Sequence, residues 1–319
     1  MTISNSSAAP LIAVVGSTGL QGGSVINNLE ASTKPYRVRG ITRDTSKPKA
    51  QELAKKGVEL VSANLSLDNK SGIEDAFRGA TYVFIMTNFW EHLDGERENA
   101  EGSLMVDSAK AVGVKLVLLS SLVSAKKASN GELTNVYHFD AKAAISDHAR
   151  AIGVPFVEIH AGGYMNNFTS FSRPRAAGDG SYVVDGTWTE TTKVPLLDTL
   201  YDFGLFVRLA IESNEFNKGD GKIISAYGEW ISIADQIKIL NEVTGKKVTY
   251  NKLSYDQSRA GLDQAGLPPH AIDDMIDMFK FQESVWENVL VESNRKELAR
   301  RPRTFREYAE AEDWSTVFV

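Results

Sequence analysis

Three regularly spaced glycines near the amino terminus could hold a phosphate group. Gly16, Gly19 and Gly22 form a G-x-x-G-x-x-G pattern between the apolar run LIAVV and a segment with helical apolar spacing. In such a loop the glycines permit a sharp turn after the strand, a close approach of backbone N–H groups to phosphate, and tight packing of helix on strand. The anion lies at the positive end of the helix. The flanking patterns favour this over a glycine-rich turn without a ligand, and they predict a pyrophosphate-binding loop of Gly16, Ser17, Thr18, Gly19, Leu20, Gln21 and Gly22.

The residues after the second predicted strand distinguish between nucleotides. An acid there binds the ribose 2′-hydroxyl of NAD, whereas a cation accommodates the 2′-phosphate of NADP. Here the strand is followed by Arg43, whose planar guanidinium suits phosphate, and Lys47 adds a second charge. Asp44 argues for NAD, and solvated basic residues on a surface loop are the alternative without a ligand. We expect NADP, in the form of NADPH, as the cofactor.

One predicted helix carries residues that could transfer a proton. His138 and Lys142 are four apart, which is about 400° around a helix, so they share a face. Tyr137 and Lys142 are five apart, about 500°, so we interpret the tyrosine as a structural or loop residue. A histidine can donate a proton near neutral pH, although a hydrogen-bonded structural histidine is the simpler interpretation. Lys142 and His138 are therefore candidate catalytic residues.

Two strand ends add further candidates. Ser120 and Ser121 end the fifth predicted strand, where a hydrogen bond to a substrate is expected. Consecutive serines are also common at strand ends without any function, and both interpretations stay open. His160, at the end of the sixth predicted strand, is equally ambiguous.

Alternating strands and helices must position these residues. The first strand contains Ile12, Val14 and Val15, and five more are predicted at Tyr36–Thr42, Val58–Ala63, Tyr82–Met86, Lys115–Ser120 and Pro155–His160. Helices are predicted between them at Pro48–Lys56, Ser71–Phe77, Glu96–Val112 and Phe139–Ile152. This alternation predicts an α/β fold, a doubly wound parallel sheet of the Rossmann type, with its ligand beyond the carboxyl ends of the strands.

The regular alternation loosens after about residue 164. We expect residues 1–165 to form an NADP-binding Rossmann domain and residues 166–319 a smaller α+β region that binds substrate or a partner and is interleaved with the first. The stretch Ser172–Trp188 is predicted to hold loops and short strands. Helices are expected at Leu200–Glu212, Ser232–Thr244, Tyr255–Gly261 and Ile272–Asn288.

The composition excludes several classes of protein. Among the 319 residues there is no cysteine, which excludes disulfides, thiol catalysis and cysteine-ligated zinc, and the five histidines lack metal-ligand spacing. A net charge of −6 offers no footprint for direct nucleic-acid binding. No run of about eighteen apolar residues and no secretory signal is present. We expect no metal, no membrane contact, and a cytoplasmic location, with access to the nucleus left open.

Several segments together resemble a known family. VVGSTGLQGGSV, ITRDTSKPKAQEL, TNFWE at 87–91, HFDAK at 138–142 and GYMNNF at 163–168 occur in this order. They are similar to the NmrA-like proteins, an atypical branch of the short-chain dehydrogenases. The match covers most of the first 170 residues, and the later half is compatible but less specific. Members include NADP-sensing proteins, a transcriptional co-repressor and true reductases, so the resemblance implies fold and nucleotide more firmly than reaction.

The resemblance also implies positions for the nucleotide. The loop Gly16–Gln21 should cradle the pyrophosphate, and Arg43 and Lys47 should hold the 2′-phosphate. Asn64 and Leu65 should edge the adenine, and Thr87, Asn88 and Phe89 should line the phosphate–ribose path. Lys142 should contact the nicotinamide ribose, and Tyr164 and Asn167 should close the nicotinamide end. Two departures stand out: Asn64 replaces a common aspartate, and Gly23 adds a glycine to the loop. The Tyr-x-x-x-Lys pair of ordinary short-chain dehydrogenases is also absent.

Two functions compete on this basis. The first is an NADPH-dependent oxidoreductase acting on a small aromatic or heterocyclic metabolite, because the loop and Lys142 are intact. A set of aromatic residues could wall an apolar pocket for that substrate: Tyr164, Phe168, Phe171, Tyr182 and Trp188. The second is an NADP-sensing redox or transcriptional regulator that binds a protein partner without catalysis, favoured by the absent tyrosine. A protein that binds the nucleotide without using it is a third, weaker possibility.

Overall fold

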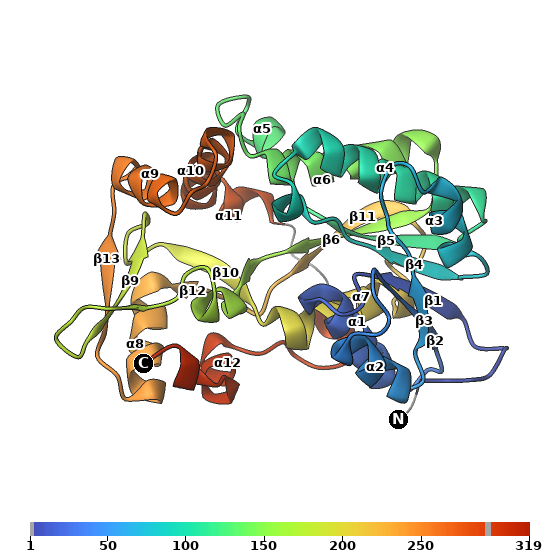
Figure 1. The fold of residues 1–319 in the computed structure, drawn as a ribbon, viewed down its shortest axis with the longest axis horizontal. Helices are drawn as coiled ribbons and strands as arrows, with labels where there is room; N and C mark the ends of the chain where they lie inside the picture. Colours follow the sequence, from blue (N-terminus) through green and yellow to red (C-terminus); the bar gives the residue numbers. More distant parts are fainter. Residues whose placement is uncertain (1–2, 291–294) are drawn as a thin grey trace.

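A parallel seven-stranded sheet forms the larger of two lobes in the computed structural model, which describes residues 3–290 and 295–319 (Figure 1). Its strands stand in the order β11-β6-β5-β4-β1-β2-β3. Their bounds are Leu11–Val15 (β1), Arg37–Thr42 (β2), Glu59–Ser62 (β3), Tyr82–Ile85 (β4), Leu116–Ser121 (β5), Phe156–Ala161 (β6) and Asp220–Ala226 (β11). The order reverses on the two sides of β1, as in a doubly wound sheet. The predicted fold class is therefore confirmed.

Helices cover both faces of this sheet (Figure 1). Their bounds are Leu20–Glu30 (α1), Pro48–Lys55 (α2), Lys70–Phe77 (α3), Gly95–Ala111 (α4), Tyr137–Ile152 (α6) and Thr199–Glu212 (α7). Along β1, Ile12 and Val14 pack toward α1 and α7, whereas Ala13 and Val15 pack toward α3, α4 and α6. All of β1 is thus buried, which is why it reads as one continuous apolar run.

The chain returns to the main sheet after its first excursion into the second lobe. Strand β11 pairs in parallel with β6, and α7 packs against α1. Strand β11 gave no strand signal in the sequence, because only its carboxyl-terminal half is buried and its first three residues are an aspartate, a glycine and a lysine. Such an edge strand lacks the apolar signal of a central one. The division at residue 165 stays a prediction.

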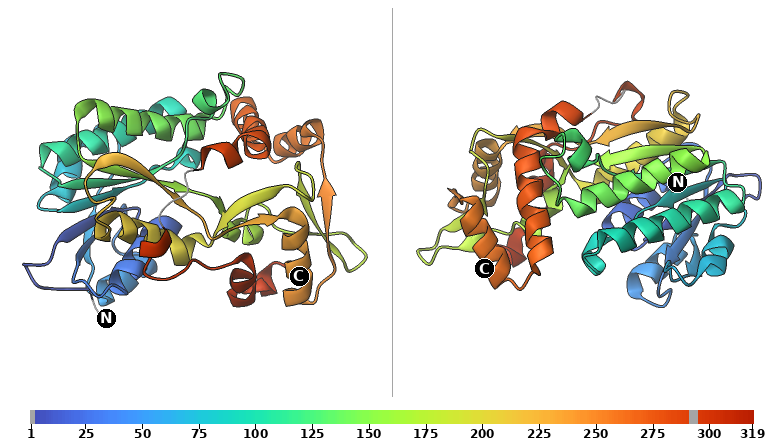
Figure 2. Two further views of the ribbon diagram at one scale, coloured as in Figure 1. Left: turned by 180° about the vertical axis from the view of Figure 1, so that it is seen from behind. Right: turned by 90° about the horizontal axis from the view of Figure 1, so that it is seen from above.

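The second lobe is built on two small sheets, seen from behind and from above in Figure 2. One has the order β12-β10-β7 and the other β13-β9-β8. The strands are Gly163–Tyr164 (β7), Arg175–Ala176 (β8), Tyr182–Gly186 (β9), Lys193–Leu197 (β10), Glu229–Ser232 (β12) and Val248–Lys252 (β13). Its helices are Ile233–Thr244 (α8), Tyr255–Gln264 (α9), Pro269–Ser284 (α10), Trp286–Val289 (α11) and Phe305–Ala311 (α12). Short helical elements elsewhere are Ala125–Ala128 (α5), which packs on α6, and the 3-10 turns Phe89–Glu91 (η1), Met165–Thr169 (η2), Arg295–Glu297 (η3) and Trp314–Thr316 (η4).

One expectation about this half needs correction. The single helix expected at Ile272–Asn288 is interrupted at Val285, which separates α10 from α11. Of the aromatic residues expected to wall a pocket, Phe168 and Tyr182 are buried in the core of the second lobe, and Trp188 packs against that core. Within the described ranges, no helix is long and apolar enough to cross a membrane.

Candidate functional site

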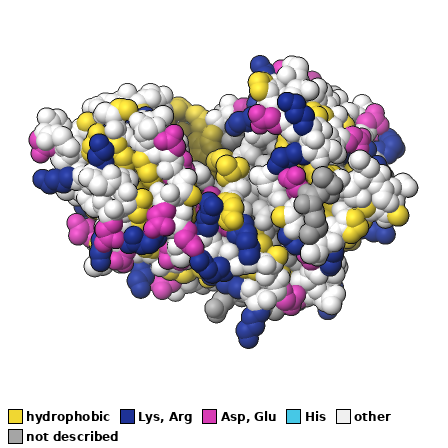
Figure 3. All heavy atoms as spheres, turned by 90° about the horizontal axis from the view of Figure 1, so that it is seen from below, with side chains coloured by type: hydrophobic (Ala, Val, Ile, Leu, Met, Phe, Trp, Pro, Cys, Tyr) yellow, Lys and Arg dark blue, Asp and Glu magenta, His cyan; other side chains and the backbone are white. Residues whose placement is uncertain are grey.

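The carboxyl ends of the central strands meet the second lobe. Strand β6 runs through Gly162 into β7, which pairs with β10 of the second lobe, and β10 leads back into α7. Figure 3 shows the surface hollowed between the two lobes, with hydrophobic side chains inside the hollow. The side chains that follow the central strands therefore lie where a doubly wound fold binds its ligand.

The glycine loop is drawn tightly together. Gly16 has φ +63°, a turn that side chains disfavour, and a Cβ on Gly22 would lie 2.3 Å from the Gly16 carbonyl oxygen. Ser17 is buried and its hydroxyl donates to the Ile41 carbonyl oxygen at 3.2 Å, which ties the loop to β2. The backbone of the loop thus needs glycine at position 16, where it turns, and at position 22, where the helix passes close to that turn.

The first turn of α1 is open to an acceptor. Its N-cap is Gly19, and no side chain caps the turn, so its backbone N–H groups remain available. Gln21 donates from Nε2 to the Tyr164 hydroxyl at 2.7 Å, and its buried Oε1 has no hydrogen-bond partner in the described part of the chain. Burial raises the pKa of Tyr164 to about 12. These two predicted site residues therefore meet, although 143 residues separate them.

The basic residues after β2 lie on the surface. The Arg43 side chain is 73% exposed, and its guanidinium forms an ion pair with Glu91 in η1. Hydrogen bonds from Ser46 lower the pKa of Asp44, which also faces Lys47 at 3.8 Å. Asp44 is thus turned toward its own loop, while Arg43 reaches across to the segment that follows β4.

The residues predicted to follow the nucleotide differ in exposure. Asn64 and Asn88 are exposed, and the Asn64 carbonyl oxygen accepts from Asn69. Leu65 packs against the core on the α3 side. The Asn167 carbonyl oxygen accepts two backbone hydrogen bonds, which close the η2 turn.

Lys142 is held by a buried acid that the sequence analysis did not identify. Its ammonium donates to the Thr87 carbonyl oxygen at 3.0 Å, the Thr87 hydroxyl at 2.8 Å and Glu98 at 2.8 Å. The Glu98 side chain is 0% exposed, and the Thr87 hydroxyl donates to the same carboxylate oxygen at 2.6 Å. All three ammonium hydrogens are therefore used within the protein. Glu98 gave no sequence signal, since it lies among several acids of an amphipathic helix.

His138 and Lys142 face the same segment, as their spacing predicts. The His138 ring packs against Phe89 and Trp90, with ring centroids 5.6 and 5.2 Å apart. Phe89 is therefore part of an aromatic cluster and is buried. Tyr137 begins α6 and is half-exposed, and its hydroxyl donates to Asn135.

The two serines point to opposite faces of the sheet. The Ser121 hydroxyl lies 2.8 Å from that of Ser146 and donates to the Lys142 carbonyl oxygen, so it anchors α6. Ser120 is half-buried on the other face. His160 lies beside Glu158 at 3.0 Å. Burial would raise the pKa of Glu158, but its hydrogen bonds, that with His160 first among them, outweigh burial and lower it.

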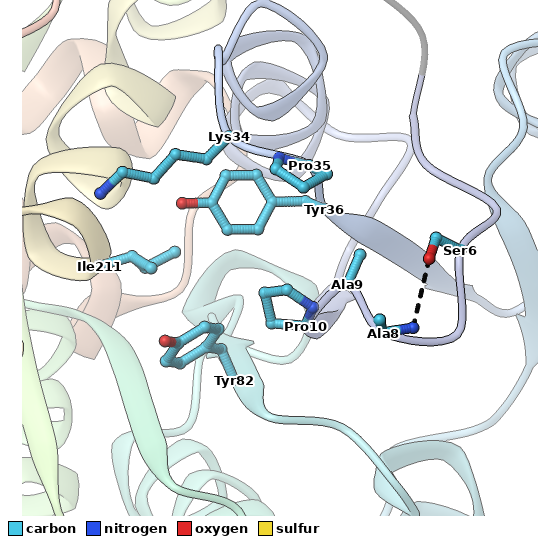
Figure 4. A pocket seen from close by; sticks show the side chains of 9 residues that line it. All are labelled: Ser6, Ala8, Ala9, Pro10, Lys34, Pro35, Tyr36, Tyr82 and Ile211. Carbon is cyan, nitrogen blue, oxygen red and sulfur yellow. Dashed lines mark hydrogen bonds between the residues drawn. The ribbon is translucent and has the colours of Figure 1, made fainter.

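A separate hollow lies at the opposite edge of the sheet. It has a volume of about 390 Å³ and is lined by side chains that include Pro10, Tyr36, Tyr82 and Ile211 (Figure 4). These residues stand at the amino ends of β1, β2 and β4 and at the end of α7. This hollow therefore lies away from the glycine loop and Lys142.

Comparison with known proteins identifies relatives along nearly the whole chain. The model of the NmrA-like family matches residues 9–309. The NmrA-like family domain-containing oxidoreductase cpsB of Aspergillus campestris is 31% identical over 301 residues, which cover 89% of this chain and 85% of that protein.

Solved structures share the fold. NmrA, a negative transcriptional regulator, in complex with NADP has a TM-score of 0.77 at 23% identity and covers 95% of both chains. The NADPH-dependent quinone oxidoreductase QOR2 of Escherichia coli, complexed with NADPH, has a TM-score of 0.74 at 22% identity and covers 93% of this chain and 98% of its own. The resemblance seen in the sequence motifs is thereby confirmed, and this chain belongs to the NmrA-like family.

Proposed function

We propose that this protein binds NADP(H) at the Gly16–Gly22 loop and reduces a small molecule held between the two lobes. The observation that carries the proposal is the close crossing of Gly22 over Gly16 beside an uncapped helix terminus. That arrangement fits a pyrophosphate, because backbone N–H groups can approach it without a side chain between them. The oxidoreductases among the relatives support the same reading.

Side chains around the loop complete the proposed binding site. Arg43 and Lys47 would neutralise the 2′-phosphate, and the unpartnered Oε1 of Gln21 offers a buried acceptor next to Tyr164. Other contacts remain as predicted, at Asn64, Leu65, Thr87, Asn88, Phe89, Tyr164 and Asn167. When bound, the nicotinamide would supply a hydride. The part of the protein is to orient the substrate, exclude water and deliver a proton.

Lys142 requires a modified role within this proposal. Its hydrogens already serve Thr87 and Glu98, so a contact with the nicotinamide ribose would have to replace one of these bonds. We propose instead that Lys142 fixes the Thr87–Phe89 segment beside the nucleotide. Ser120, Ser121 and His138 remain candidates for contact with the substrate, although Ser121 is already bonded to α6.

The proposed substrate is a small aromatic or heterocyclic carbonyl compound or quinone. Its support is the quinone oxidoreductase among the structural neighbours and the hydrophobic hollow between the lobes. The aromatic residues of the second half add no further support, since Phe168 and Tyr182 lie in its core and Trp188 packs against it.

A regulatory function without catalysis is the second candidate. Lys142, paired with Glu98 and lacking a tyrosine four residues before it, favours it, as does the likeness to a negative transcriptional regulator. Titration with NADPH and NADH, followed by consumption of NADPH with aromatic aldehydes and quinones, tests both. Binding with turnover supports the enzyme. Binding without turnover, together with a nucleotide-dependent protein partner, supports the regulator.

Arg43→Asp is expected to reverse the nucleotide preference. NADPH affinity should fall about tenfold or more, about 1.4 kcal/mol, because a carboxylate repels the 2′-phosphate and accepts from a 2′-hydroxyl instead. Fluorescence titration with both nucleotides measures the ratio. Glu91→Gln is the matched control: it frees Arg43 from its ion pair and should preserve or strengthen the preference for NADPH. Tighter NADH binding by the wild-type protein would contradict the assignment.

A further inference from the structure

A carboxylate from the second lobe faces His138 with both of its oxygens. Asp274 lies on α10, 136 residues further along the chain, and is fully buried. Its Oδ2 accepts from the His138 backbone N–H at 3.0 Å, and its Oδ1 lies against Nδ1 of the ring, although neither Oδ1 nor Nδ1 completes a hydrogen bond within the described residues. Asp274 therefore anchors the start of α6 and borders the imidazole at Nδ1.

This contact determines which ring nitrogen can exchange a proton with a ligand. A carboxylate beside Nδ1 keeps a hydrogen on that nitrogen, as in other His–Asp pairs. Nε2 is then the atom that gives or takes a proton, and it makes no hydrogen bond within residues 3–290 and 295–319. The rings of Phe89, Trp90 and Phe139 pack around the imidazole and limit its movement.

The other titratable groups on this side of the sheet are less suited to donate a proton. The Lys142 ammonium donates its three hydrogens to Thr87 and Glu98. Burial raises the pKa of Tyr164 to about 12, which makes its hydroxyl a weak acid. Tyr137 is half-exposed and turned to Asn135. His138 is left as the group that faces a buried carboxylate, is enclosed by aromatic rings and makes no hydrogen bond at Nε2 among the described residues.

We propose that Asp274 positions His138 so that Nε2–H protonates the substrate oxygen, which makes the donor complete only when α10 is docked on α6. The inference rests on the proposed NADPH-dependent reduction. The substrate carbonyl accepts a hydride and its two electrons and becomes an oxyanion, and the nicotinamide is oxidised. Nε2 then gives its proton to the oxyanion, forming the O–H bond, and solvent returns a proton to the ring. While both ring nitrogens carry hydrogen, the Asp274 carboxylate balances the positive charge.

The structure supplies a control for simple docking of the lobes. Asn135 donates to Asp277 at 2.8 Å, one helical turn beyond Asp274, so Asp277 also joins α10 to the region before α6. Both acids are buried, but in the part of the chain that the structure describes Asp277 bonds to Asn135 and Lys280 and not to His138. Asp277→Asn therefore weakens the same helix contact without touching the imidazole.

Asp274→Asn, His138→Gln and Asp277→Asn test the proposal in the full-length protein. Asparagine has one acceptor oxygen and one NH2 group, so with its oxygen on the His138 backbone N–H its NH2 group faces Nδ1 and no longer favours a hydrogen there. We expect kcat for NADPH-dependent reduction of 4-nitrobenzaldehyde to fall about 100-fold in the first two variants. KM for NADPH should stay within about twofold, because the loop is unchanged. With menadione the loss should be smaller, because an aryloxide product is less basic than an alkoxide and needs the donor less.

A spectroscopic measurement on the nucleotide-free protein separates the inference from the proposed function. Two-dimensional ¹⁵N correlation spectra distinguish Nδ1-protonated from Nε2-protonated imidazole, and His138→Gln identifies the signal among five histidines. The wild type and Asp277→Asn should show hydrogen on Nδ1 of His138, and Asp274→Asn should lose that pattern. Wild-type kcat in Asp274→Asn, or an equal loss in Asp277→Asn, overturns the positioning role. A wild type that binds NADPH but reduces neither probe overturns the proton-donor role together with the enzyme, whereas a wild type that fails to bind NADPH overturns the proposed function itself.

Discussion

Gly22→Val is expected to remove measurable NADPH binding. A Cβ at this position would lie 2.3 Å from the Gly16 carbonyl oxygen, 2.7 Å from its carbonyl carbon and 2.9 Å from the Ser17 Cα, all of them backbone atoms. The first turn of α1 must then move away from the loop that presents its N–H groups to phosphate. We expect affinity to fall at least about 100-fold, about 2.7 kcal/mol, in a fluorescence titration.

The next residue provides the control. A Cβ on Gly23 would meet only Leu200 Cδ1 at 3.8 Å and the Ser17 carbonyl oxygen at 3.9 Å, which are ordinary contacts. Gly23→Ala should therefore leave the affinity unchanged and stabilise the helix by up to about 1 kcal/mol. Melting curves of both variants show whether either is unfolded. Equal affinities of Gly22→Val and Gly23→Ala would contradict the assignment of this loop.

Lys142→Met is expected to cause the largest loss of stability. The Lys142 ammonium is the cation that faces Glu98, whose side chain is 0% exposed. Its removal leaves the carboxylate with the Thr87 hydroxyl as its remaining hydrogen-bond partner among the described residues. Breaking a buried ion pair on one side costs about 3–5 kcal/mol. Urea denaturation at neutral pH, with the free energy of unfolding extrapolated to water, measures the loss.

A double variant tests the cause of this loss. Replacing both charges, in Glu98→Leu with Lys142→Met, should recover most of the stability, since no unpaired charge is then buried. Lys127→Met removes an exposed ion pair between Lys127 on α5 and Asp147 on α6, the helix that also carries Lys142. This change should cost less than about 1 kcal/mol. A Lys142→Met variant as stable as Lys127→Met would show that Glu98 does not depend on Lys142.

The double variant also tests whether Lys142 contacts the nicotinamide ribose, as the sequence predicts. If the lysine binds the nicotinamide ribose, NADPH affinity should remain low after stability has recovered. If it only fixes the Thr87–Phe89 segment beside Glu98, affinity should follow stability. The same purified protein serves both measurements.

The amino-acid sequence by itself determined the central architecture and the position of the loop. The alternation of buried strands with amphipathic helices and the spacing of Gly16, Gly19 and Gly22 are short-range patterns, and short-range backbone geometry follows directly from them. The four-residue spacing of His138 and Lys142 likewise predicted that both face one segment, because helix geometry is regular. Strand β11 could not be predicted in this way, because it is an edge strand that is only half-buried and so lacks a continuous apolar pattern.

The partners of the polar side chains were decided by the tertiary structure alone. Glu98 and Asp274 look like ordinary helix acids in the sequence, yet packing buries each against one candidate residue, Lys142 and His138 respectively. Gln21 meets Tyr164 in the same way, across 143 residues. The sequence around a charged helix residue is the same whether that residue faces solvent or is covered by another helix or strand. Which of the two occurs depends on how distant segments pack, and that packing sets both the cost of burial and the orientation of the group that could react.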